Sequence, residues 1–147
     1  MRIMHLAGGG DIGGAKTHII SLVKELSGSN TLKLVSFRYG DFAKTAKDAG
    51  IDVVEIKSGI IFKDIHELFS IYDEFKPDIV HCHGAKANMM GLFLKRHRQA
   101  CVTTTIRSDY RKDYMHNIFK QATLGLFNTL ALRIIKFHVA VTEQFAR

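Results

Sequence analysis

Proline, cysteine and tryptophan are scarce in this chain of 147 residues, which holds one proline, two cysteines and no tryptophan. With a single proline and no linker of serine or glycine, the sequence offers no boundary between domains, and its length predicts one domain. The apolar content of 46% is enough to fill one core without disulfides. Cys82 and Cys101 stand far apart, each inside an apolar run. We therefore expect two small buried thiols in a reducing compartment, and neither a disulfide nor a metal site.

Long hydrophobic runs are absent as well. The longest apolar stretch, residues 122–135, is interrupted by polar side chains and falls short of the roughly 20 apolar residues that a membrane span needs. The run before the first glycines carries a single charge and is too short for a signal peptide. These absences predict a cytoplasmic protein without a transmembrane helix.

Positive charge is distributed unevenly. The net charge is +7, and residues 86–120 contribute most of it, with eight Lys or Arg against two Asp or Glu. Such an excess suits an anionic membrane surface, a phosphorylated substrate or nucleic acid, and it is equally typical of a solvated face that aids solubility. The candidate residues of this basic surface are Lys95, Arg96, Arg98, Arg111 and Lys112.

Short apolar runs alternate with helical patterns along the whole chain. The expected strands occupy residues 2–7, 32–37, 52–56, 78–82, 100–106 and 137–141. The expected helices occupy residues 15–26, 42–49, 63–75, 85–96 and 114–136, the last being one helix or two broken near Gly125. This alternation predicts an α/β fold, a Rossmann-like doubly wound parallel sheet between two layers of helices. Ligands of such sheets bind at the carboxyl ends of the strands.

A glycine-rich loop separates the first expected strand from the first helix. Gly8, Gly10 and Gly13 satisfy the G-x-G-x-x-G pattern, in which glycines allow a sharp turn and amides at the helix start favour an anion. Gly10, Gly13 and Gly14 would contact the phosphate, although a tight turn that binds nothing has the same pattern. No acidic residue ends the second strand, which disfavours NAD, whereas Arg38 leaves NADP open because it could face a 2′-phosphate. The lack of GK[ST] excludes a P-loop.

Two histidines stand at the end of the fourth expected strand, and a polar loop follows the fifth. His81 and His83 stand two apart, so both face the same side of the sheet at different heights. No third metal ligand is close in sequence, so we expect no metal site. His83 is the candidate for the ligand cleft, and His81 is expected to be partly buried and satisfied. After the fifth strand, Arg107 could clamp a phosphate or carboxylate, or simply pair with Asp109 in a solvated loop.

Four segments, in this order, resemble the N-terminal domain of the retaining glycosyltransferases of family 4, which have the two-domain GT-B architecture. The segments are GGGDIGGAKTHIISLVKEL, KPDIVHCHGAKANMMG, VTTTIRSDYRKDY and HVAVTEQFA, and together they span essentially the whole chain. The resemblance implies that residues 1–147 form the acceptor-side domain. It also implies a C-terminal, donor-binding domain that this chain lacks, so the chain alone would be inactive.

The resemblance further implies roles for residues and partners. The glycine loop would reach the diphosphate of a nucleotide-sugar donor, and no metal or other cofactor would be needed, because helix dipoles and basic residues neutralise the leaving diphosphate. Family members often carry histidine where this chain has Arg107, the candidate catalytic residue. The acceptor or sugar side would comprise His83, Lys86, Asn88, Asp109 and Tyr110.

The acceptor expected from this resemblance is a glycan or a lipid-linked molecule, in cell-envelope polysaccharide synthesis. An anionic membrane surface at the cytoplasmic face is a further expected partner, and nucleic acid is not. Two alternatives stay open at this point. One is an NADP-binding oxidoreductase domain, and the other is a non-enzymatic basic module that binds membranes peripherally.

Overall fold

The computed structural model describes residues 1–106 and 128–140, which form one parallel sheet flanked by helices. The order of the six strands in the sheet is β3-β2-β1-β4-β5-β6. Their bounds are β1 Arg2–Ala7, β2 Thr31–Ser36, β3 Val53–Glu55, β4 Ile79–His83, β5 Val102–Ile106 and β6 Phe137–Ala140. This strand order and the parallel pairing confirm the predicted doubly wound, Rossmann-like fold.

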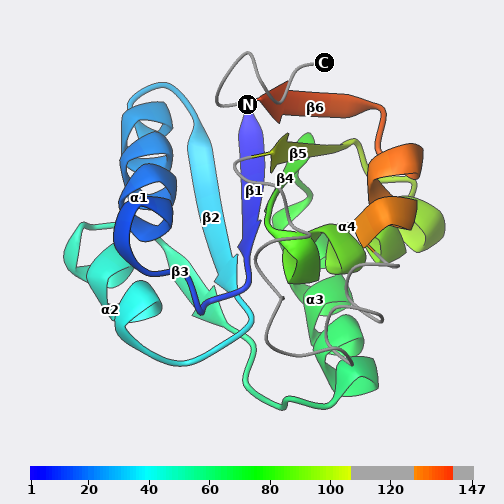
Figure 1. Cartoon of the computed structure of the whole chain (residues 1–147), viewed down its shortest axis with the longest axis horizontal. Helices are drawn as coiled ribbons and strands as arrows, with labels where there is room; N and C mark the ends of the chain where they lie inside the picture. The colour runs from blue at the N-terminus through cyan, green and yellow to red at the C-terminus, as the bar shows by residue number, and fades with distance from the viewer. Residues whose placement is uncertain (107–127, 141–147) are drawn as a thin grey trace.

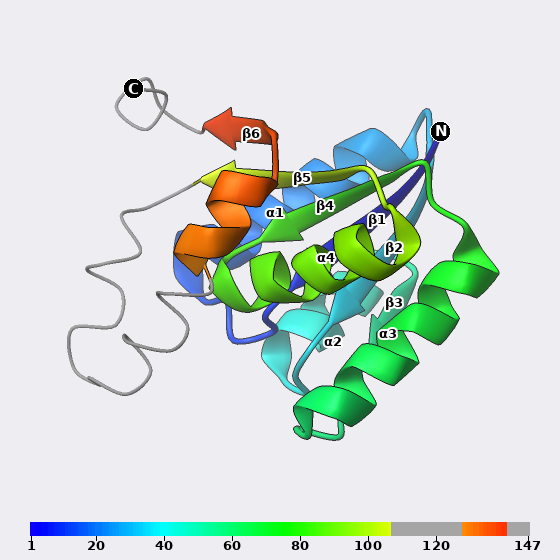
Figure 2. The same ribbon diagram turned by 90° about the vertical axis from the view of Figure 1, so that its right-hand side faces the viewer.

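Helices cover both faces of the sheet. Their bounds are α1 Gly13–Ser27, α2 Asp41–Asp48, α3 Ile61–Phe75 and α4 Ala85–Arg98, and residues 128–134 are helical as well. Helices α1 and α2 lie on one side of the sheet, and α3 and α4 lie on the other (Figures 1 and 2). The three-layer arrangement therefore follows the prediction. The part of the last expected helix that precedes residue 128 lies outside the described residues.

Observed boundaries differ from the predicted ones where they matter for the site. Helix α1 begins at Gly13, two residues earlier than expected, so both Gly13 and Gly14 belong to its first turn. Strand β4 ends at His83, one residue beyond the expected bound, which places this histidine at the end of the strand as predicted. Helix α3 ends at Phe75, where Lys76 adopts a left-handed conformation immediately before Pro77.

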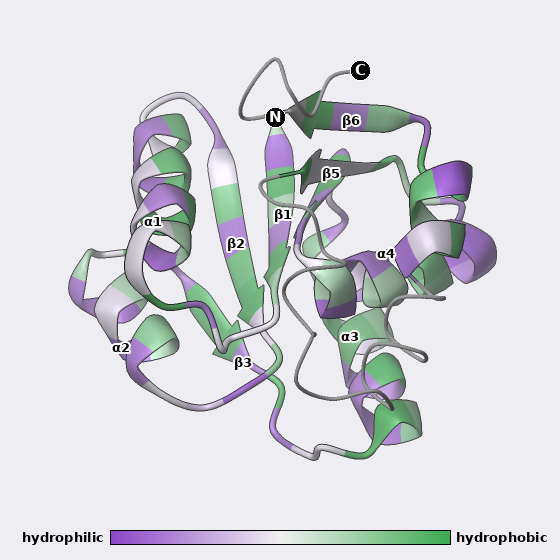
Figure 3. Cartoon of the chain, in the orientation of Figure 1, coloured by the Kyte–Doolittle hydropathy of each residue, from purple (hydrophilic) through white to green (hydrophobic). Residues whose placement is uncertain are grey.

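The core consists of two apolar clusters, one on each side of the sheet. The larger cluster lies on the side of α3 and α4 and includes Met4 and Leu6 of β1. The smaller cluster packs Ile19 and Val23 of α1 against β2 and α2. Strand alternation divides β1 between the two sides, and Figure 3 shows hydrophilic residues interrupting its hydrophobic ones.

The two cysteines do not share one environment. Cys82 is buried, as predicted, but Cys101 is exposed, so the prediction of two buried thiols is wrong for Cys101. Its neighbours Ala100 and Val102 are both buried. Alternation along an extended chain sends the residue between two buried ones to the opposite side, where Cys101 meets solvent.

Candidate functional site

The strand order reverses between β1 and β4, and this is where the site begins. Strand β1 pairs with β2 on one side and with β4 on the other. The loop after β1 therefore leads to α1 on one face of the sheet, while the turn at Gly84 leads from β4 to α4 on the other face. Open parallel sheets bind ligands in the crevice that such a reversal creates.

The glycines of the first loop serve different purposes. Gly9 has a φ of +80°, and a Cβ there would lie 2.5 Å from Ser36 Oγ and 2.8 Å from Arg38 Cβ, so only glycine fits. A Cβ on Gly13 or Gly14 would meet nothing within 4 Å. Packing thus requires Gly9, a position that the G-x-G-x-x-G pattern leaves unspecified, whereas the space beside Gly13 and Gly14 is open.

The first turn of α1 has the features of an anion site. Its N-cap residue, Ile12, makes no side-chain capping hydrogen bond, and the first turn contains no acidic residue. The amides of a first helical turn have no partner within the helix, and the helix dipole adds partial positive charge there. Lys16 lies one turn along and pairs with Asp41 of α2 at 2.6 Å, which lowers the pKa of that carboxyl. An incoming phosphate would meet that turn on the side where Gly13 and Gly14 leave space open.

Arg38 stands beside the glycine loop. A Cβ built on Gly10 would be 3.4 Å from an Arg38 guanidinium nitrogen, and Ser36 Oγ donates a hydrogen bond to the Arg38 carbonyl at 2.9 Å. The arginine side chain is exposed. Its charge therefore lies at the same edge as the open turn of α1, where it can add to the attraction for an anion.

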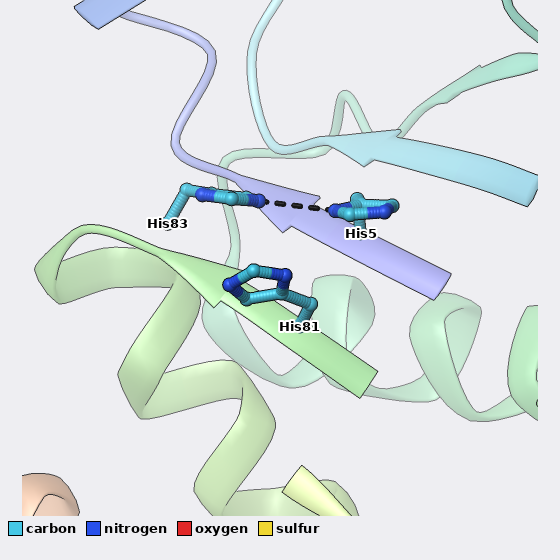
Figure 4. Close-up of side chains that lie close together, drawn as sticks. All are labelled: His5, His81 and His83. Carbon is cyan, nitrogen blue, oxygen red and sulfur yellow. Dashed lines mark hydrogen bonds between the residues drawn. The ribbon is translucent and has the colours of Figure 1, made fainter. Parts of the chain in front are cut away.

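Three histidines converge on the α1 side of the sheet, at β1 and β4. His5 pairs in register with His81, and Ala7 with His83, so alternation directs all three rings to one side. Figure 4 shows the rings facing one another, with His5 Nδ1 3.1 Å from His83 Nε2. The ring centroids of His81 and His83 are 4.4 Å apart, and His81 Nε2 lies 2.6 Å from Thr105 Oγ1 of β5. His81 is thus buried and bonded, as the sequence predicted.

Burial keeps the rings of His5 and His81 neutral. It lowers the pKa of His5 to about 3, an effect to which the neighbouring His81 adds. Burial also lowers the pKa of His81 to about 4, assisted by His18 on α1. Both values lie far below neutral pH, so His5 and His81 carry no charge there. The sequence argument looked for a third histidine near His81 and His83 along the chain, and it missed His5 because that residue comes from another strand.

Lys86 and Asn88, both expected on the acceptor side, have different surroundings. Lys86 is half-buried: its ammonium donates to the Phe37 carbonyl at 3.1 Å and lies 3.7 Å from Asp64. Asn88 is buried, accepts a hydrogen bond from Thr104 and donates one to Asn128 at 2.7 Å. An acceptor could reach Asn88 only if those bonds broke. His83 is also buried, with 1% of its surface exposed.

Only part of the predicted basic surface is described. Arg96 and Arg98 are exposed and Lys95 is half-buried, all on the last turns of α4. Arg98 forms a two-pronged pair with Asp73, which lowers the pKa of that carboxyl. This pairing reduces the positive charge that the basic surface presents to solvent. The other expected site residues lie outside the described part of the chain: Arg107, Asp109, Tyr110, Arg111 and Lys112.

Exposed apolar side chains follow β1, β2 and β3, at the carboxyl edge of the sheet. Ile12 is 81% exposed and Phe62 80% exposed, and Ile60 and Tyr39 are exposed as well. Lys57 places its ammonium 4.1 Å from the centre of the Tyr39 ring. Sequence analysis did not single out these residues, because an apolar residue at a helix start looks like part of the core. Within residues 1–106 and 128–140, no helix has the length and apolar character needed to cross a membrane.

Several solved structures have the same arrangement of strands and helices. HepE from Anabaena, solved with UDP and glucose, matches with a TM-score of 0.69 at 13% identity, over 95% of this chain and 43% of that one. MurG from Acinetobacter baumannii matches with a TM-score of 0.68 at 16% identity, over 95% and 40%. A glycosyltransferase from Rickettsia africae matches with a TM-score of 0.65 at 20% identity, over 99% and 38%. The chain therefore shares its fold with part of each of these longer structures.

Sequence comparison then gives the family. The model of Glycosyltransferase Family 4 matches residues 12–147, so the chain belongs to that family. No curated protein matches the chain. The chain spans about two fifths of the length of the structures it resembles, with 43% of HepE and 40% of MurG covered.

Proposed function

We propose that the chain is the acceptor-side half of a glycosyltransferase, which moves a sugar from a nucleotide-sugar donor to a glycan or lipid-linked acceptor with retention of configuration. The observation that carries this proposal is the open first turn of α1, which lies at the strand reversal beside Arg38 and contains no acidic residue. Family membership supports it, as do the HepE structures that contain UDP or UDP-glucose.

The donor diphosphate would contact Gly10, Gly13 and Gly14. Helix amides and the Arg38 guanidinium would stabilise its charge in the transition state, so the transfer step needs no metal ion. A second domain, such as the longer structures contain, would hold the rest of the donor. Arg107 would act on the sugar side together with Asp109 and Tyr110.

Among the expected acceptor-side residues that the structure describes, Lys86 is the one that an acceptor can reach most directly. His83 and Asn88 are buried, whereas about a third of the Lys86 side chain is exposed, at 33%. Its ammonium is anchored by Phe37 and Asp64, which fixes its position at the edge of the sheet. Lys86 would therefore hold an acceptor hydroxyl or phosphate, while His83 and Asn88 would shape the wall behind it.

A lipid-linked acceptor at the cytoplasmic face of a membrane suits the exposed apolar edge. Ile60 and Phe62 project into solvent between Lys57 and Lys63. An apolar side chain flanked by lysines favours the interface of an anionic bilayer. Flotation with anionic vesicles should therefore recover the wild-type protein, and it should recover less of a Phe62→Ser variant. Equal recovery of both would remove this edge from the proposal.

The transferase itself is tested by incubating the longest natural form of the protein with UDP-, GDP- and ADP-sugars. Titration calorimetry should detect binding of one of them, and NMR of the product should show the anomeric configuration of the donor. Failure to bind any of the three would refute the proposal. Arg38 leaves NADP as a second candidate, and quenching of NADPH fluorescence by the chain would favour that reading.

A further inference from the structure

His5 and His81 have no task in the proposed transfer, and His83 would only shape the wall behind the acceptor. All three residues are buried on the α1 side of β1 and β4. We propose that these three residues form a binding site for a divalent transition-metal ion, with Zn²⁺ as the type. The ion is not assigned to the transfer step, and the inference does not depend on the function proposed above.

The spacing of the nitrogens is close to that of a coordination sphere. One ring nitrogen from each histidine lies within 4.8 Å of those of the other two, and His5 Nδ1 lies 3.1 Å from His83 Nε2. Ligands about 2.0–2.1 Å from a tetrahedral zinc ion are about 3.3 Å apart. The distance between His5 Nδ1 and His83 Nε2 is already close to this value. The most widely separated pair of ring nitrogens would have to approach by about 1.5 Å, and rotation of the side chains can supply that movement.

The chemistry of the cluster selects the kind of ion. Imidazole binds zinc, copper and nickel, whereas magnesium and calcium prefer oxygen ligands, which this group of three does not contain. Imidazole must also be neutral to bind a metal. Burial keeps His5 and His81 neutral at physiological pH, because it lowers the pKa of both rings.

The fold orients one ring and leaves a nitrogen of another unused. The Thr105 hydroxyl fixes His81 through Nε2, which leaves Nδ1 of that ring for the ion. Such hydrogen bonds to the outer nitrogen commonly orient metal-binding histidines. His5 Nε2 is buried and has no hydrogen-bond partner among the described residues. This nitrogen of His5 is therefore an exception in the interior, where buried polar atoms normally have a hydrogen-bond partner.

A fourth histidine, His18, lies on α1, on the same side of the sheet as the cluster. His18 on α1 lies near enough to influence His81 and could supply a fourth nitrogen in place of water.

The test measures Zn²⁺ binding by the 147-residue chain in competition with a chromophoric chelator, after removal of bound metal. We expect one equivalent to bind at micromolar concentration or below, and Co²⁺ to give the visible absorption of a tetrahedral site. His5→Gln and His81→Gln should each weaken binding at least about tenfold. Thr105→Val retains all three rings and should weaken it about 10- to 100-fold, through loss of orientation alone.

The matched controls are His66→Gln on α3 and His97→Gln on α4, two exposed histidines outside the cluster. Both should bind Zn²⁺ like the wild type. Binding of less than one equivalent by the wild type would overturn the proposal and leave the cluster as a hydrogen-bonded group. Equal weakening in the control and cluster variants would also overturn it. If His5→Gln or His81→Gln loses its far-ultraviolet circular dichroism, Thr105→Val alone decides.

Discussion

Strands β1 and β4 present two very different faces. Toward α3 and α4 they direct Leu6, Val80 and Cys82, all part of one buried apolar cluster. Toward the α1 side the same strands direct His5, His81 and His83, whose apolar neighbours in register include Leu34 of β2 and Ala7 of β1. One face thus packs against apolar side chains, and the other holds buried polar side chains beside the strand reversal. From this difference we expect the apolar face to contribute more to stability than the histidine face does.

Substituting adjacent residues of β1 should reveal this division most strongly. Leu6→Ala removes a fully buried side chain from the apolar face and should lower the free energy of unfolding by about 3 kcal/mol. His5→Leu removes the bond to His83 but adds apolar volume, so we expect a change of about 1 kcal/mol or less. Urea denaturation measures both. If His5→Leu is as damaging as Leu6→Ala, the histidine face is structural and the comparison fails.

A smaller effect is expected where α4 packs on the apolar face. Gly91 lies inside that helix, and a Cβ there would lie 2.4 Å from Cys82 Sγ and 3.2 Å from Val102 Cγ1. Alanine normally favours a helix over glycine by about 1 kcal/mol. Here overpacking should outweigh that gain and destabilise Gly91→Ala by about 1–2 kcal/mol. A thermal melt of the variant tests this, and an increase in Tm would show that the helix can move away from β4.

The sequence predicts most of this fold because its signals are local. Apolar runs bounded by Gly84 or Pro77 give the strands, and apolar spacing of three and four residues gives α1 and α3. The parallel order then follows from alternation of the two element types. The start of α1 was missed by two residues, since glycine has low helix propensity and Gly13 and Gly14 do not resemble helix residues.

The candidate site was less predictable because its contacts join distant segments. His5 meets His83 across 78 residues, and only the order of strands β1 and β4 brings them together. The only hint of this contact in the sequence was the presence of a histidine inside the apolar run 2–7. Asn88 was expected at the acceptor, yet it bonds to Thr104 and Asn128, a pairing that no local pattern encodes. The sequence did not single out Gly9, because the G-x-G-x-x-G motif specifies residue positions and says nothing about the space around each residue.

The smallest change in stability should accompany the clearest change in binding, at Gly14. A Cβ there would meet nothing within 4 Å, and its φ is not in the left-handed region, so Gly14→Ala should leave the fold intact or stabilise it by up to about 1 kcal/mol. The same methyl group would occupy the space in which we propose the donor diphosphate lies, so the affinity of the longest natural form for its nucleotide sugar should fall about tenfold or more. Gly28→Ala, at the other end of α1, is the matched control, because its Cβ would make only an ordinary 3.6 Å contact. Thermal melts and titration calorimetry of both variants give the two readouts. Unchanged donor affinity in a folded Gly14→Ala variant would show that the diphosphate does not bind at this helix start.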